Sequence, residues 1–207
     1  MIFEQFLNQL SKYGVAKLES PIFYTFPIGI RFKIAISHPY NIAGILKKSF
    51  VDECVDRAES IFKSLDFSGD VLMVFNADKS ERNAINTFTE CFSGQYDKEV
   101  IEITDVDDES NEYQYERFFF KLKTEQLLIK KLFKLIVEAD FGGILSFNSA
   151  IYIFDLEKEI MFHLYDDRGL DVVSSNKKAL MPIYSQFHDW ILPYDVEKID
   201  KLFNSSE

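Results

Sequence analysis

The sequence predicts an α+β fold, a single domain whose mostly antiparallel sheet is covered by helices. The chain has 207 residues, of which 47% are hydrophobic and 21 are Phe, so a large core can be buried. Apolar residues recur with helical spacing in some segments and run continuously or alternate in others. The second half ends in short runs separated by turn residues, which is typical of an antiparallel meander.

The first third contains two predicted helices and one predicted strand. Apolar residues of 2–13 share one helical face, and Gly14 ends that helix. Residues 28–37 alternate apolar residues with Gly, Arg, Lys and Ala, which predicts a half-buried strand. A 3.6-residue pattern then predicts a long helix over 44–65.

The middle of the chain predicts a central strand with helices beside it. The continuous apolar run 71–77 is typical of a buried strand, and 83–92 forms a short helix. The acidic segment 96–113 holds one edge strand and one exposed loop. Aromatic residues predict a strand over 113–123. Thr124 is expected to cap a helix over 125–140, which the following Gly residues end.

The last third predicts the meander. Residues 150–155 and 159–165 form a hairpin around a turn at 156–158, and Gly169 closes a second turn with a positive φ. Residues 170–173 pair back. A helix starts at Ser175 or Asn176, Trp190 is buried in the next loop, and 196–203 forms a closing helix.

Charge and cysteine content exclude several classes of protein. The net charge is −11, and residues 51–120 alone contribute six basic and eighteen acidic groups. Such a chain does not attract nucleic acid, whereas a basic protein is attracted to it. Cys54 and Cys91 lack metal-ligand spacing and suit a reducing compartment. Because the N-terminus lacks a signal peptide and no apolar run reaches membrane-span length, we expect a cytoplasmic protein without a membrane partner.

The segment FHLYDDRGLDVVSS, residues 162–175, carries the strongest chemical pattern. Asp166, Asp167, Arg168 and Asp171 can be interpreted as a carboxylate cluster that holds Mg²⁺ or Mn²⁺, as a partner-binding turn, or as a hairpin turn stabilised by its own charges. Adjacent strand residues point to opposite faces, so Asp166 and Asp167 are not expected to share a metal ion. We favour the hairpin turn.

Two further residues belong to this possible site. His163 is the one histidine placed near the turn, as a potential base or as a half-buried strand residue. Arg31 lies in an apolar strand, so it pairs with a carboxylate, for which Asp166 and Asp167 are candidates, or faces water. The chain lacks a phosphate loop and the HExxH and GxSxG motifs, and we expect no catalytic residue, metal or cofactor.

The acidic loop formed by Asp105, Asp107, Asp108 and Glu109 is the second candidate site. It is either a solvated surface loop or a docking surface for a basic protein. The spacing lacks the glycine and the final glutamate of an EF-hand, which disfavours a calcium loop.

Three stretches together resemble a known family. PIFYTFPIGIRFKIA (21–35), FHLYDDRGLDVVSS (162–175) and IYSQFHDWILPYDVEKIDKLF (183–203) are similar, in this order and spacing, to the bacterial domain of unknown function 3885. The resemblance covers nearly the whole chain and matches 40–112 only loosely. Its motif positions here are Gly29, Arg31, 165–169, Asp171, Trp190 and Tyr194. Some members are linked to Rhs-type polymorphic toxin loci, which implies an immunity or accessory role.

These observations lead to three functional expectations. The first is a non-enzymatic cytoplasmic binding protein that acts as an immunity protein against a toxin with a basic domain. The second is a metal-dependent hydrolase that uses Asp166, Asp167 and Arg168. The third is a scaffold role with another protein partner. The sequence leaves the oligomeric state open and does not separate the first role from the third.

Overall fold

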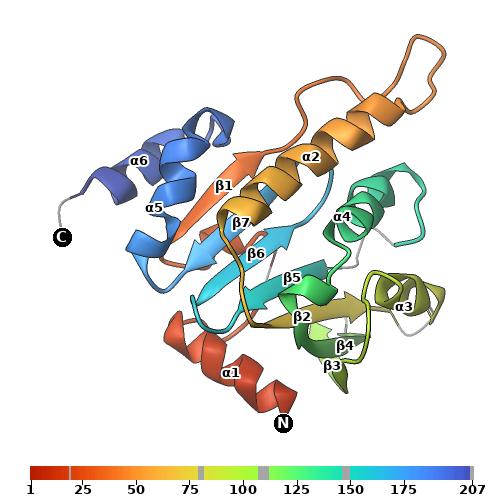
Figure 1. Cartoon of the computed structure of the whole chain (residues 1–207), viewed down its shortest axis with the longest axis vertical. Helices are drawn as coiled ribbons and strands as arrows, with labels where there is room; N and C mark the ends of the chain where they lie inside the picture. Colours follow the sequence, from red (N-terminus) through yellow and green to blue (C-terminus); the bar gives the residue numbers. More distant parts are fainter. Residues whose placement is uncertain (19, 79–81, 107–111, 146–149, 206–207) are drawn as a thin grey trace.

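A computed structural model describes the chain except for residues 19, 79–81, 107–111, 146–149 and 206–207. Its centre is a seven-stranded sheet in the order β1-β7-β6-β5-β2-β4-β3, in which all neighbouring strands are antiparallel. The strands are β1 (Gly29–Lys33), β2 (Asp70–Ala77), β3 (Asp97–Val106), β4 (Glu112–Lys123), β5 (Ala150–Asp155), β6 (Ile160–Leu164) and β7 (Gly169–Ser174). The predicted α+β class and the C-terminal meander β5-β6-β7 are therefore confirmed (Figure 1).

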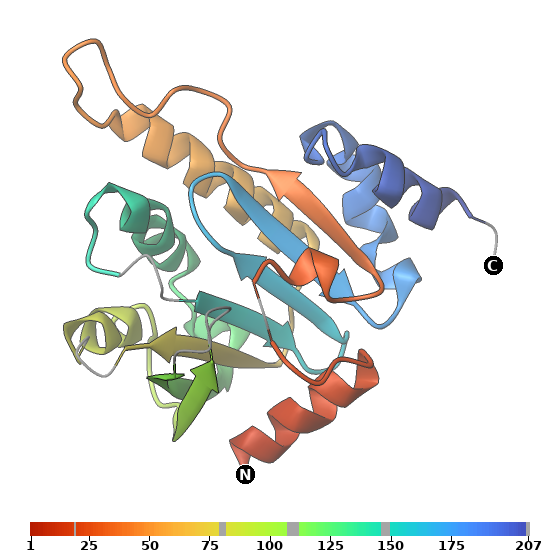
Figure 2. The same ribbon diagram turned by 180° about the vertical axis from the view of Figure 1, so that it is seen from behind.

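The helices cover both faces of the sheet. They are α1 (Ile2–Lys12), α2 (Lys48–Ser64), α3 (Arg82–Thr89), α4 (Ile129–Glu138), α5 (Lys177–Gln186) and α6 (Val196–Asn204). Short 3₁₀ turns are η1 (Ile22–Tyr24), η2 (Thr124–Gln126), η3 (Ala139–Phe141) and η4 (His188–Trp190). Figure 2 shows η1 in front of the sheet and α2 behind it, so the fold has three layers.

Strand β2 shows how the core is divided. Val71, Met73 and Phe75 face the larger core, which α2, α4 and α5 complete. Leu72 and Val74 face a smaller core built with α1 and the segment around η1. Because successive side chains of a strand point to opposite faces, a strand buried on both faces must be a continuous apolar run, as the sequence has here.

Several predicted boundaries were wrong. The strand predicted over 28–37 ends at Lys33, and the helix predicted over 44–65 begins at Lys48. Thr124 does not cap a helix, because its hydroxyl donates to the Gly69 carbonyl and a 3₁₀ turn precedes α4. Trp190 is half-buried rather than buried. The Arg57 guanidinium lies over its ring, 3.9 Å from the ring centroid.

Candidate functional site

The loop between β6 and β7, which we call the motif loop (Tyr165–Gly169), is held by Asp166. Its carboxylate accepts hydrogen bonds from the backbone N–H groups of Arg168 at 2.7 Å and Gly169 at 3.2 Å. The Arg168 guanidinium also donates to the same carboxylate, through Nε at 2.7 Å and through Nη2. This is the self-stabilised turn that the sequence favoured, with aspartate accepting local N–H groups.

Gly169 is required for a reason other than the predicted one. Its φ lies outside the left-handed region, so the expected positive φ is wrong. Instead, the Tyr165 ring lies directly over it. A Cβ atom at position 169 would lie 2.1 Å from the Tyr165 hydroxyl and 3.0 Å from the Phe32 carbonyl oxygen. Glycine is therefore the residue that lets Tyr165 pack against the start of β7.

Arg31 on β1 lies between two tyrosine rings. Its guanidinium carbon is 5.2 Å from the Tyr24 ring centroid and 5.3 Å from that of Tyr165. Its Nε donates to the Tyr165 hydroxyl at 3.0 Å, and its Nη1 donates to the Tyr24 hydroxyl at 2.9 Å. The nearest paired carboxylates belong to Asp171, at 3.6 Å, and Asp195, at 3.9 Å. The predicted pairing with Asp166 or Asp167 is therefore wrong, because strand register decides the partner.

Asp171 on β7 lies in the middle of a row across three strands. The pairing register places Arg31 of β1 on one side of it and His163 of β6 on the other. Its side chain is 0% exposed, and Oδ2 accepts from the Phe23 backbone N–H at 3.0 Å. Burial raises the pKa of Asp171 to about 7, against the opposing effects of that N–H and of Arg31. Among the described residues, Oδ1 of Asp171 has no hydrogen-bond partner.

His163 is buried and hydrogen-bonded through both ring nitrogens. Nδ1 lies 2.8 Å from the Ile151 carbonyl oxygen, which can only accept, so we assign the proton to Nδ1. Nε2 then accepts from the Ser20 hydroxyl at 2.9 Å. The ring stacks on Tyr152 with centroids 4.2 Å apart. Burial lowers the pKa of His163 to about 4, so the ring is neutral at pH 7.

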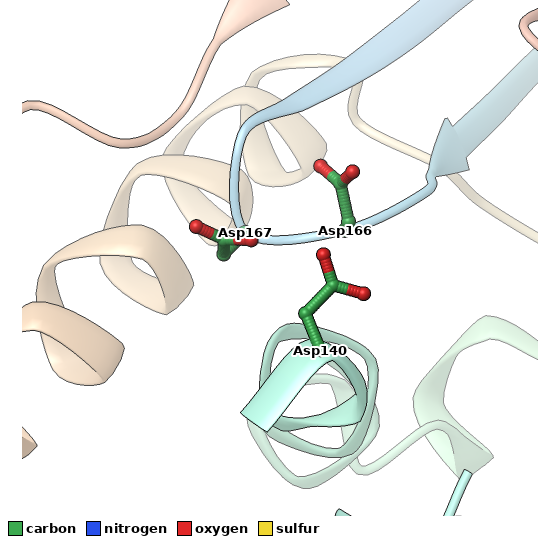
Figure 3. A group of neighbouring side chains, drawn as sticks. All are labelled: Asp140, Asp166 and Asp167. Carbon is green, nitrogen blue, oxygen red and sulfur yellow. The ribbon is translucent and has the colours of Figure 1, made fainter. Parts of the chain in front are cut away.

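Three carboxylates lie close together around the motif loop. Asp140 in η3 points toward the loop that carries Asp166 and Asp167 (Figure 3). One ligand oxygen from each lies within 4.8 Å of the others, which is compatible with a shared cation. The premise that Asp166 and Asp167 lie on a strand is wrong, because they lie in a loop. Strand alternation therefore does not keep them from facing one ion.

Raised pKa values and a neighbouring guanidinium both reduce the negative charge of this acidic cluster. Burial raises the pKa of Asp167 to about 6, with a further contribution from Asp166. Burial and Asp166 also raise the pKa of Asp140. Arg168 is the internal counter-ion, because its Nη2 bonds Asp166 and lies 3.9 Å from Asp140. A metal ion would have to compete with this guanidinium.

A cavity of about 580 Å³ opens beside the motif loop. Four of the six residues that we predicted for this site line it, namely Arg31, His163, Asp166 and Arg168. The remaining lining residues are Ser20, Pro21, Asp140, Ala150, Tyr165 and Leu192. Sequence analysis missed Ser20 and Asp140, which no motif marks and which only the tertiary fold brings here.

The acidic hairpin, which we define as residues 97–116, contributes β3, the strand at the far edge of the sheet. It carries nine acidic residues and one basic residue, a net charge of −8. Asp105, at the end of β3, is partly buried and lies 3.4 Å from the Lys17 ammonium. The other predicted contact residues, Asp107, Asp108 and Glu109, lie outside the described residues.

The two edge strands of the sheet, β1 and β3, differ in whether a neighbouring segment bonds to their outer backbone groups. At β1, the Leu192 N–H donates to the Arg31 carbonyl at 2.9 Å and Ile191 bridges to Phe32, so the C-terminal segment covers this edge. At β3, within the described ranges, no strand pairs with the outer edge. The predicted edge strand is thus confirmed, and its uncovered backbone groups can accept another strand.

The loop between β1 and α2 extends beyond the rest of the fold in both views (Figures 1 and 2). It exposes Ile36, Tyr40 and Ile45, and Ile42 is fully exposed. Asn41 fixes its conformation, since its side-chain oxygen accepts from the backbone N–H groups of Ala43 and Ile45. An ordered apolar protrusion of this kind is typical of contact surfaces.

Comparisons with known proteins confirm the resemblance to the family of unknown function. A family model described as domain of unknown function (DUF3885) matches residues 3–195. The chain is also 30% identical over 91 residues to the uncharacterized protein YnaE of Bacillus subtilis (strain 168). That match spans 41% of this chain and 43% of YnaE, less than half of either. No solved structure matches the chain.

In the described part of the chain, the helices are too short or too polar to cross a bilayer. The family match spans all seven strands and both candidate sites, from α1 to the residue before α6. The chain belongs to the family of domain of unknown function DUF3885.

Proposed function

We propose that this protein binds a basic protein partner along the acidic hairpin. One observation carries the proposal: among the described residues no strand pairs with the outer edge of β3, and β3 belongs to the segment with a net charge of −8. In its finer form, the protein is a cytoplasmic immunity protein that neutralises a toxin domain by direct binding. The negative charge supports this form, and the resemblance implies it through the family members that are linked to toxin loci.

The geometry suggests how such a partner would be held. A ten-residue edge strand offers backbone N–H and C=O groups to which an extended segment can add as a further strand. Acidic side chains beside that edge attract basic residues, which speeds association and makes it salt-dependent. Both contributions act at the same place.

The experiment captures partners from native cells with two charge-matched variants. Glu102→Lys/Glu112→Lys changes exposed acids of the hairpin, and Asp189→Lys/Glu197→Lys changes exposed acids of the C-terminal segment. Both raise the net charge by four. We expect one stoichiometric basic partner, retained by wild type and by the control, lost from the hairpin variant, and released by high salt. Equal capture by both variants, or no partner at low salt, would refute the proposal.

Metal-dependent hydrolysis is a second candidate, favoured by the convergence of Asp140, Asp166 and Asp167 within 4.8 Å. In this proposal the carboxylates hold Mg²⁺ or Mn²⁺ and Arg168 moves to steady an anionic substrate. Titration calorimetry with each ion tests it. If no heat of binding is seen at millimolar metal, the existing pairing of Arg168 with Asp166 outcompetes the ion and this candidate is removed.

A further inference from the structure

Ser20 and His163 are joined by a hydrogen bond in the wall of the cavity. Ser20 is exposed, lines the cavity and donates its hydroxyl proton toward Nε2 of His163 across 2.9 Å. The other ring nitrogen donates to the Ile151 carbonyl at 2.8 Å, which fixes both the tautomer and the ring orientation. A hydroxyl, an imidazole and an acceptor behind it, connected in this order, are the arrangement that activates serine nucleophiles.

We propose that Ser20 is a nucleophile, that His163 is its general base, and that the cavity accepts the acyl group of a small ester. The cavity supplies what the reaction requires. Pro21, Ala150 and Leu192 give an apolar wall for a short acyl chain. Arg31 lines the same cavity and is positively charged, so it can stabilise negative charge that develops on the carbonyl oxygen.

The reaction balances with water as the co-reactant. Oγ of Ser20 bonds to the carbonyl carbon of the ester while the hydroxyl proton of Ser20 passes to Nε2 of His163. The ester C–O bond then breaks. His163 gives that proton to the leaving alcohol. Water next attacks the acyl group and loses a proton to Nε2, the acid leaves, and the proton returns to Ser20 Oγ. The net change is ester plus water to acid plus alcohol.

Charged and titratable groups with opposite effects on its protonation surround the imidazole of His163. Asp171 of β7 is its cross-strand neighbour, and Arg31 of β1 lies next in the row. Tyr152 of β5 stacks on the ring, and Tyr165 and Asp166 follow His163 closely in the chain. The negative charge of Asp166 favours the imidazolium form, against the cost of burial.

A small alkyl fluorophosphonate tests the proposal without knowledge of the natural ester. Oγ of an activated serine displaces fluoride from phosphorus, and the adduct is visible by intact mass and peptide mapping. We expect one adduct, on Ser20, formed at least tenfold faster than in the urea-unfolded chain. Ser20→Ala should abolish it. Ser11→Ala is the matched control and should retain it, because the Ser11 hydroxyl donates to the Asn8 carbonyl at 2.8 Å instead of to an imidazole.

The pH dependence gives a second readout that does not rely on a buried substitution. With His163 as the base, the labelling rate should change by less than twofold between pH 8 and pH 5, since its pKa is about 4. A tenfold loss of rate over that range would contradict the assignment of His163. Labelling no faster than in the unfolded chain, or equal labelling of Ser20→Ala, would overturn the proposal. Neither result bears on partner binding by the acidic hairpin.

Discussion

The molecule contains two acidic regions that differ in how deeply their charges are buried and in how those charges are paired. At the motif loop, Asp166 is buried and bonded to two backbone N–H groups and to Arg168. In the acidic hairpin, the described acidic residues are exposed or partly exposed, with one basic residue among nine acids. Buried charges that have partners determine a conformation, whereas exposed charges cost little and remain available to a partner.

This difference teaches that acidic residues alone do not identify a site. In the sequence the motif loop had the strongest pattern of a catalytic or metal-binding site, yet the strongest contacts of Asp166 are with other residues of the same loop. The hairpin looked like a solvated surface, yet it adjoins the uncovered edge of the sheet. If the two regions differ in this way, changes in the motif loop should cost more stability than changes in the acidic hairpin.

The largest expected effect comes from Gly169→Ala. The new Cβ would lie 2.1 Å from the Tyr165 hydroxyl, so the ring must leave its position. We expect a loss of about 3 kcal/mol in the free energy of unfolding, the upper range for overpacking, measured by urea denaturation. In a Tyr165→Ala background the same change should cost much less. Additive costs would show that Tyr165 is not the obstacle.

A direct comparison of the two regions follows from Asp166→Ala and Glu112→Ala. Asp166→Ala leaves two N–H groups and Arg168 without their acceptor, so we expect a loss of about 2 kcal/mol. Glu112→Ala removes an exposed acid of the hairpin, and we expect a change below about 0.5 kcal/mol. Urea denaturation of both variants measures this. Similar losses would contradict the proposed division between the two regions.

The smallest expected net effect is that of pH on the free energy of unfolding of the wild type, in which two large contributions have opposite signs. The folded pKa of Asp171 is about 7, above the value of an unfolded aspartate, so the folded state binds more protons and this contribution to stability is lost as pH rises from about 4 to 7. His163 has the opposite sign, because its folded pKa is lowered to about 4 and its contribution grows over pH 4 to 6.5. The two effects partly cancel in the wild type.

Asp171→Asn separates these contributions. We expect the wild type to lose stability relative to this variant as pH rises from 4 to 7, in denaturation experiments at several pH values. A difference in unfolding free energy that stays constant over this range would mean that Asp171 ionises in the folded state as it does in the unfolded chain.

Sequence reasoning identified the elements but not the contacts among distant residues. The run 71–77 predicted β2 because a strand buried on both faces must be apolar throughout. It could not pair Arg31 with Asp171, since that requires the register of β1 on β7. Ser20 and His163 are 143 residues apart, and neither lies in a recognisable catalytic motif. Asp140 likewise reaches the motif loop only through the packing of α4.

Local rules also failed where tertiary contacts were stronger. Gly169 follows two aspartates and an arginine, which is typical of a turn that needs a positive φ, but the packing of Tyr165 explains it. Thr124 has the residue type of a helix cap, but its hydroxyl reaches the Gly69 carbonyl at 3.3 Å. In both cases the residue type correctly marked a boundary between elements, but a tertiary contact, not the expected local rule, explains the residue.

The central claim is that the uncovered edge of β3 receives the partner while the motif loop does not. Amide hydrogen exchange of the protein, alone and with its captured partner, tests this claim most directly. We predict that binding protects the amides of β3, residues 97–106, because an added strand would accept hydrogen bonds from those that point outward. Exchange in the motif loop should not change. Protection confined to the motif loop, with β3 exchanging as it does in the free protein, would contradict the account.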